Sequence, residues 1–250
     1  MEQLNQQIAA HPDDGPLYLR RATAYRNRQH WDEAARDLER AERLAVHPLE
    51  LAMAWGRLHL EAGRPAAAVG ALDRALDEDP SHLVARRLRA RAAFESGDFD
   101  RAVDDYVQVL ESAQSPTPDL VLDAASALAA SGQLERAVEE IDRAVARFGS
   151  LTSLEQAAIT YLSRLGRLDA ALERTHRLPD KTRFAERWWL TRGNILEQAG
   201  RAGEAREAYG RARSLLESRT AGRPRSQTIE DVRERLDQAL ERLGEARAQE

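Results

Sequence analysis

The chain has 250 residues, of which 42% are hydrophobic and 32% are charged, and its formal net charge is −5. This balance predicts a folded, soluble chain, and the acidic excess argues against a general nucleic-acid-binding surface, because phosphate binding needs a concentrated excess of Lys and Arg. The absence of cysteine excludes disulfides, thiolate metal sites and cysteine nucleophiles.

The side-chain composition favours thin helical layers. Only 13 residues are aromatic, so a core must be built mainly from Ala, Leu and Val. Lys181 is the only lysine beside 36 arginines, a bias that is typical of a GC-rich bacterial genome.

Two features bear on localisation. No window of about 20 apolar residues exists, so we expect no membrane insertion. The first residues, Met1 to Ala10, are polar and lack the basic start and apolar stretch of a signal peptide. We therefore expect a cytoplasmic location, with an exported bacterial protein whose leader has been removed as the alternative.

A short motif ending in alanine recurs along the chain. Successive copies are separated by 34, 34, 35, 34 and 34 residues, a register that chance does not maintain. Glycine stands at the same position before five copies, where Gln29 replaces it in the first, and it suits the left-handed end of a helix. The motif alanines are Ala34, Ala68, Ala102, Ala137, Ala171 and Ala205.

The register divides the chain into elements. Residues 1–14 form a half-unit or cap, in which Leu4, Ile8 and Pro12 fit the end of a preceding repeat. Six pairs of amphipathic helices follow at 15–48, 49–82, 83–116, 118–151, 152–185 and 186–219.

Two elements depart from the pattern. The fifth repeat has the polar Thr175 where the other repeats have a large side chain, and Pro179 comes earlier than a proline at the end of a regular repeat would. The fifth repeat should therefore have a shortened second helix. Residues 220–250 are predicted to form a linker and a capping helix from about Gln227 to Leu243 that ends at Gly244.

The pattern resembles the tetratricopeptide repeat family, whose repeats of about 34 residues place small and large apolar residues at fixed positions. The resemblance extends over residues 15–219 and implies an all-α protein, a right-handed α-solenoid superhelix of six helix pairs plus a C-terminal capping helix. We expect one continuous array over 1–250, without separable domains. The sixth repeat matches through Trp189, Gly193, Leu196, Ala205, Tyr209 and Ala212.

No residue pattern indicates catalysis. The six histidines include no pair three or four residues apart, which excludes the helical zinc-protease motif. Phosphate loops, dinucleotide fingerprints and serine elbows are also missing from the sequence. We expect no enzymatic activity, no cofactor and no metal site.

The resemblance places ligand contacts on the first helices of the repeats, which line a concave groove. Arginine forks in such a groove suit carboxylates and favour an acidic peptide or an exposed C-terminus, while coding bias toward arginine is the alternative explanation. The Lys and Asn that mark chaperone-tail-binding members are replaced by Leu19 and Thr23 in the first repeat. The expected groove residues are Arg26, Arg57, Arg87 and Arg91, flanked by Leu19, Met53, Leu60 and Phe94.

The resulting hypothesis is a non-catalytic scaffold or adaptor that binds a protein or peptide segment, possibly an acidic one, in the groove. A regulatory subunit of an enzyme complex and a homo-oligomeric structural element remain alternatives. The expected oligomeric state is a monomer or a weak homo-oligomer.

Overall fold

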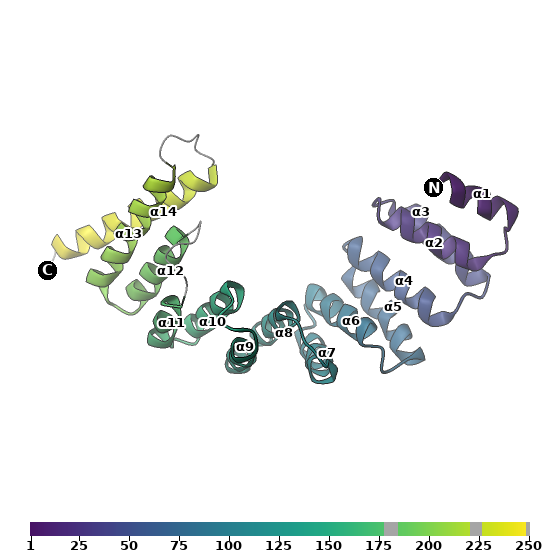
Figure 1. Cartoon of the computed structure of the whole chain (residues 1–250), viewed down its shortest axis with the longest axis horizontal. Coiled ribbons are helices and arrows are strands. Elements are labelled where there is room, and N and C mark those ends of the chain that lie inside the picture. Colours follow the sequence, from purple (N-terminus) through teal and green to yellow (C-terminus); the bar gives the residue numbers. More distant parts are fainter. Residues whose placement is uncertain (178–184, 221–226, 249–250) are drawn as a thin grey trace. The chain divides into compact units, whose positions relative to one another are not determined.

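The protein is built from helices. Its structure, a computed structural model, describes residues 1–177, 185–220 and 227–248, and within these ranges it contains fourteen helices and no strand (Figure 1). The predicted all-α solenoid of helix pairs is confirmed. The helices are α1 (Glu2–Ala10), α2 (Gly15–Arg26), α3 (Trp31–Arg43), α4 (Pro48–Glu61), α5 (Pro65–Glu78), α6 (Leu83–Ser96), α7 (Phe99–Ser112), α8 (Pro118–Ala130), α9 (Leu134–Phe148), α10 (Thr152–Arg164), α11 (Leu168–Thr175), α12 (Ala185–Gln198), α13 (Ala202–Thr220) and α14 (Gln227–Ala248).

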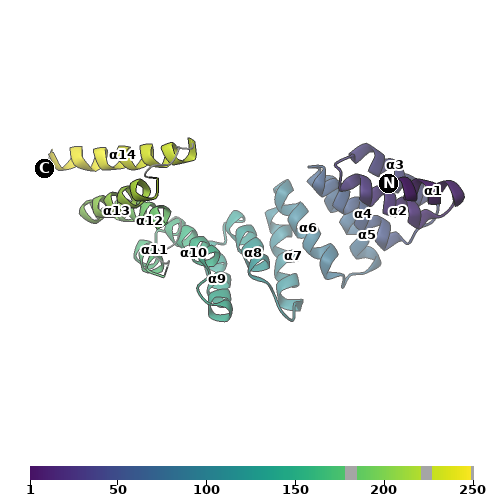
Figure 2. The ribbon, with the colours of Figure 1, turned by 45° about the horizontal axis from the view of Figure 1, so that its top comes forward.

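The helices form two compact units, an N-terminal unit of Met1–Gln133 and a C-terminal unit of Leu134–Glu250. In the N-terminal unit α2 packs on α3, α4 on α5, and α6 on α7, while α8 packs against α7 (Figures 1 and 2). In the C-terminal unit the pairs are α10 with α11 and α12 with α13. The single continuous array expected for residues 1–250 stays a prediction.

The turns between paired helices use left-handed backbone. Gly63 has a φ of 69°, and the glycines at the equivalent positions of the later repeats also have positive φ, as the sequence predicts. Gln29 takes the same geometry with a φ of 62°, although a side chain makes this conformation costly. The turn therefore requires left-handed backbone geometry at this position, whichever amino acid occupies it. The equivalent glycines are Gly97, Gly132, Gly166 and Gly200.

Small residues set the distance between paired helices. All six motif alanines are at most 1% exposed. Gly56 of α4 faces Leu72 of α5, and a Cβ added to Gly56 would lie 2.6 Å from the Leu72 Cγ. The same holds in the sixth repeat, where a Cβ on Gly193 would lie 2.4 Å from the Tyr209 ring. The large side chain of one helix thus fills space that its partner leaves empty.

Pairs of opposite charge connect the helices of several repeats, and the first and third repeats use the same spacing. In the first, Arg21 of α2 donates two hydrogen bonds of 2.7 Å to Asp37 of α3. In the third, Arg89 of α6 donates two of 2.8 Å to Asp105 of α7, which is 2% exposed. Arg89 also bonds Asp73 of the preceding repeat at 2.7 Å. The sequence signal was an Arg and an Asp sixteen positions apart in both repeats, and our sequence analysis missed it.

The fifth repeat has the predicted short second helix, since α11 has only 8 residues. Charge replaces apolar packing there. Glu155 of α10 is 0% exposed and accepts a hydrogen bond of 3.0 Å from Arg174 of α11, which also bonds Asp142 of α9. Burial alone would lower the pKa of Arg174, but these two carboxylates outweigh it and raise the pKa. Pro179 lies outside the described residues.

Single helices pack against the first and the sixth repeat. α1 packs on α2 and buries Ile8, while Leu4 is half-buried. α14 packs on α13 and buries Leu236. The predicted helix end at Gly244 is wrong, because α14 continues to Ala248. An interior glycine costs a helix only about 1 kcal/mol, and the helix-forming residues that follow outweigh this cost.

The close approach of α4 and α5 can be tested by Gly56→Ala. We expect this change to lower the free energy of unfolding by about 1–2 kcal/mol, because overpacking against the buried Leu72 exceeds the gain in helix propensity. Gly70→Ala in α5 is the control, since a Cβ there meets nothing within 4 Å, and it should stabilise the protein by up to about 1 kcal/mol. Urea unfolding followed by circular dichroism measures both, and equal effects would contradict the packing argument.

The inter-helix ion pairs can be tested by Arg89→Ala. This variant leaves the Asp105 carboxylate buried with only a 3.4 Å bond from Arg86, so unfolding free energy should fall by about 3 kcal/mol. Arg101→Ala removes an arginine that is 43% exposed and contacts Asp73 and Asp98. This surface change should cost less than about 1 kcal/mol. Similar losses in both variants would show that burial of Asp105 does not matter.

Candidate functional site

The exposed side of the first helices α2, α4, α6 and α8, called the first-helix face below, carries the expected arginines of the N-terminal unit. Arg87 and Arg91 lie one turn apart on α6, with side chains 46% and 59% exposed. Arg57 is exposed on α4, at the repeat position that Arg91 occupies on α6, and α4 packs directly against α6. The structure therefore brings these three cations onto neighbouring helices.

Arg26 behaves differently from the other expected arginines. Its guanidinium lies 3.3 Å from the Glu61 carboxylate of α4, and its side chain is only 15% exposed. It also donates a hydrogen bond of 3.1 Å to Asn27. Arg26 thus serves mainly as a link between the first two repeats.

The apolar residues expected in the groove are partly withdrawn from the surface. Met53 and Leu60 are 8% and 5% exposed and belong to the core that α4 forms with α5 and α6. Leu19 and Phe94 are half-buried, and Phe94 packs against Phe99 with ring centroids 5.6 Å apart. The reason is that α4 is covered by α2 on one side and α6 on the other. Met53 and Leu60 therefore do not present the open apolar contacts that we expected from them.

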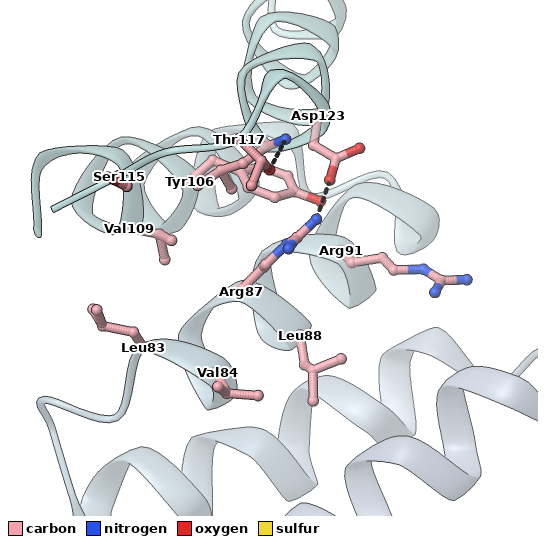
Figure 3. Close-up of a pocket in the computed structure, with 11 residues that line it drawn as sticks. Leu83, Val84, Arg87, Leu88, Arg91, Tyr106, Val109, Ser115, Thr117 and Asp123 are labelled. Atoms are coloured by element: carbon pink, nitrogen blue, oxygen red, sulfur yellow. Dashed lines mark hydrogen bonds and ion pairs between the residues drawn. The ribbon is translucent and has the colours of Figure 1, made fainter. Parts of the chain in front are cut away.

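An open pocket of about 620 Å³ lies between α6, α7 and α8 (Figure 3). Both Arg87 and Arg91 line it, together with residues that the sequence did not single out. Its apolar wall consists of side chains from all three helices. These are Leu83, Val84 and Leu88 of α6, Val109 of α7 and Leu120 of α8.

The polar end of the pocket is formed by three side chains. The Arg87 guanidinium lies 3.2 Å from the Asp123 carboxylate of α8, and the ring of Tyr106 is directed toward this pair (Figure 3). Burial raises the pKa of Tyr106 above its ordinary value, and the negative charge of Asp123 raises it further. The phenol is therefore protonated at neutral pH. Sequence reasoning missed Asp123 because its partner lies on the previous repeat.

The repeat is irregular beside the pocket. The 35-residue interval between Ala102 and Ala137 contains one extra residue, and α7 and α8 are themselves continuous helices joined by residues 113–117. Ser115 and Thr117 of this connection line the pocket. First helices α2 and α4, and α4 and α6, contact each other, whereas α6 and α8, both fully described, lack a comparable contact.

The start of α8 is fixed by local hydrogen bonding. Thr117 is the N-cap, and its hydroxyl accepts a hydrogen bond of 3.3 Å from the Leu120 amide (Figure 3). Pro118 occupies the first turn, where its missing amide proton is not needed. These features hold Asp123 in place opposite Arg87.

The described residues do not support a metal site or a membrane-spanning helix. Among them, no three His, Asp or Glu side chains are grouped so that they could hold a metal ion. None of the described helices is long and apolar enough to cross a lipid bilayer.

Comparison with known proteins agrees with the repeat architecture, which defines a helical-repeat solenoid. The sequence profile of the tetratricopeptide repeat matches at residues 19–82, 53–118 and 87–152, which together span more than half of the chain. The chain belongs to the tetratricopeptide repeat family. No curated protein sequence matches it significantly.

Solved structures share the fold at low sequence identity. A tetratricopeptide repeat protein from Parabacteroides merdae aligns over 94% of this chain and 90% of its own, with 16% identity and a TM-score of 0.60. MamA aligns over 72% of this chain and 97% of its own, with 16% identity and a TM-score of 0.63. YrrB, described as a TPR protein with an unusual peptide-binding site, aligns over 85% and 91%, with 17% identity and a TM-score of 0.51.

The electrostatics of the pocket can be tested by Asp123→Asn. Removing the carboxylate takes away a charge that disfavours tyrosinate and frees Arg87, which favours it, so the pKa of Tyr106 should fall while staying above its ordinary value. The measurement is the tyrosinate absorbance during an alkaline titration, with Tyr106→Phe subtracted to isolate this residue. An unchanged titration would contradict the arrangement of Arg87, Asp123 and Tyr106.

Proposed function

We propose that this protein is a non-catalytic scaffold or adaptor that binds an acidic segment of another protein on the first-helix face of its N-terminal unit. The observation that carries the proposal is that two arginines on that face are exposed and have no strong partner among the described residues. Arg57 is exposed and makes no ion pair with any described residue, and Arg91 pairs only with Glu95 of its own helix, at 2.7 Å.

Such arginines are available to a ligand. An exposed pair between residues four apart on one helix contributes only about 0.3–0.5 kcal/mol, so a ligand carboxylate can replace Glu95 at little cost. Arginine binds carboxylates through two parallel hydrogen bonds, which adds geometric specificity. By contrast, Arg21 and Arg89 hold buried aspartates and are not available.

The pocket supports binding rather than catalysis. Its ionisable side chains are two arginines, one aspartate and one tyrosine whose pKa is raised, so the tyrosine is a poor proton acceptor at neutral pH. Membership of the tetratricopeptide repeat family points the same way, because a solenoid provides an extended surface for a partner chain.

Selection from a random-peptide display library on the full chain tests this proposal. We expect the wild type to enrich acidic peptides over the starting library, and the Arg57→Glu, Arg91→Glu double variant to bind those peptides at least about tenfold more weakly. Raised salt should also weaken wild-type binding.

The matched control is Arg36→Glu, Arg43→Glu. Both arginines are exposed on α3, a second helix, so the control changes net charge equally without altering the first-helix face. If the control lost as much affinity as the test variant, binding would follow net charge alone. If the wild type enriched no acidic peptides, the proposed function would be wrong.

A further inference from the structure

The pocket beside the arginines indicates what else the ligand must contain. We infer that the pocket between α6 and α8 takes one large apolar side chain of the bound segment, and that the segment's acidic residues lie on the α4 side of this side chain. The inference rests on the proposed function, which it makes more specific.

The apolar wall is unusually exposed. Among the described residues only three large hydrophobic side chains are exposed, and two of them, Leu83 at 36% and Val84 at 51%, line this pocket. A ligand side chain placed against them would remove this apolar area from water, which is favourable. The volume of about 620 Å³ is ample for an aliphatic or aromatic side chain.

The polar end of the pocket is already neutralised. Arg87 and Asp123 face each other at 3.2 Å, so their charges largely cancel at the position nearest to the apolar wall. A charged ligand group inserted here would have to displace one of them. The interior of the pocket therefore suits an uncharged side chain, with the Tyr106 hydroxyl available as a donor toward the backbone that carries it.

Charges of opposite sign flank the pocket. On the α4 side stands Arg57, and Arg91, whose partner Glu95 is replaceable, lines the pocket itself. On the α8 side stands Asp119, which is exposed. An acidic segment is attracted to the first side and repelled by the second, so this gradient fixes which side of the apolar residue carries the acidic ones.

Helix packing sets the spacing along the ligand. Axes of packed helices lie about 8–10 Å apart, so Arg57 on α4 stands about 15 Å from a pocket beyond α6. An extended chain rises about 3.3 Å per residue, which puts the carboxylate for Arg57 roughly three to five residues from the apolar residue. Arg91, on α6 itself, would meet a carboxylate only about one or two residues away.

The test uses the peptides enriched on the wild type, aligned and then synthesised singly. We expect each to contain a large apolar residue with acidic residues within about five positions on one side of it only. Replacing that apolar residue by Ser should weaken binding about tenfold or more. Fluorescence anisotropy of labelled peptides measures the affinities.

Two protein variants address the pocket from exposed positions. Val84→Glu places a charge against the apolar wall, and Ser115→Trp fills the pocket from the α7–α8 connection. Ser115→Trp should weaken the apolar-containing peptide about tenfold and leave its Ser-substituted version unaffected. Val84→Glu also repels acidic residues, so it should weaken both peptides, the apolar-containing one more strongly. Leu151→Glu is the control, because Leu151 is 39% exposed but lies in the C-terminal unit. Circular dichroism of each variant serves to check that it is folded.

The outcomes separate the two proposals. The inference would be overturned if the enriched acidic peptides shared no apolar residue, or if both folded pocket variants bound at full strength. In either case the proposed function would still stand. Acidic residues distributed evenly on both sides of the apolar residue would overturn the assigned spacing and polarity. A wild type that enriches no acidic peptides would overturn both.

Discussion

The close approach of paired helices is the constraint on which the rest of this structure depends. Ala34, Ala68 and Ala102 are almost fully buried where the two helices of each pair meet, and Gly56 leaves room for the whole side chain of Leu72. Interiors are packed at crystal-like density, so one added methyl group at such a point has no space. This constraint requires a small residue at the same position of every pair, and it therefore underlies the repeat that the sequence shows.

Arginine has two distinct roles in this protein, and burial separates them. Arg21 and Arg89 hold nearly buried aspartates between helices, where removal of either partner would strand a charge. Arg57 and Arg91 stand on the first-helix face without buried partners. An abundance of arginine in the sequence does not explain the buried pairs, because composition does not decide which guanidinium meets a carboxylate in the core.

Local patterns in the sequence predict the fold well and the site only in part. Turn geometry at Gly63 and the short α11 depend on residues close in sequence, so a single chain suffices to predict them. The burial of Met53 depends on coverage by neighbouring helices, and the partner of Arg87 comes from the next repeat. The repeat register gives each residue a position within its own repeat. It carries no information about how tightly the helices of adjacent repeats pack against each other. Arg87 and Arg91 were found from the register, and the pocket between them and α8 was not.

The first helices of the N-terminal unit are not evenly packed. Helices α4 and α6, whose repeats keep the 34-residue period, contact each other. Where one residue is added, between α7 and α8, the next first helix stands apart and two hydrophobic side chains of α6 stay exposed. Leaving apolar area in water costs stability, and the Thr117 cap together with the Arg87–Asp123 pair offsets part of that cost. A ligand that filled the pocket would remove this apolar area from water, so the proposed binding would draw its free energy from an irregular connection and not from the repeated positions alone.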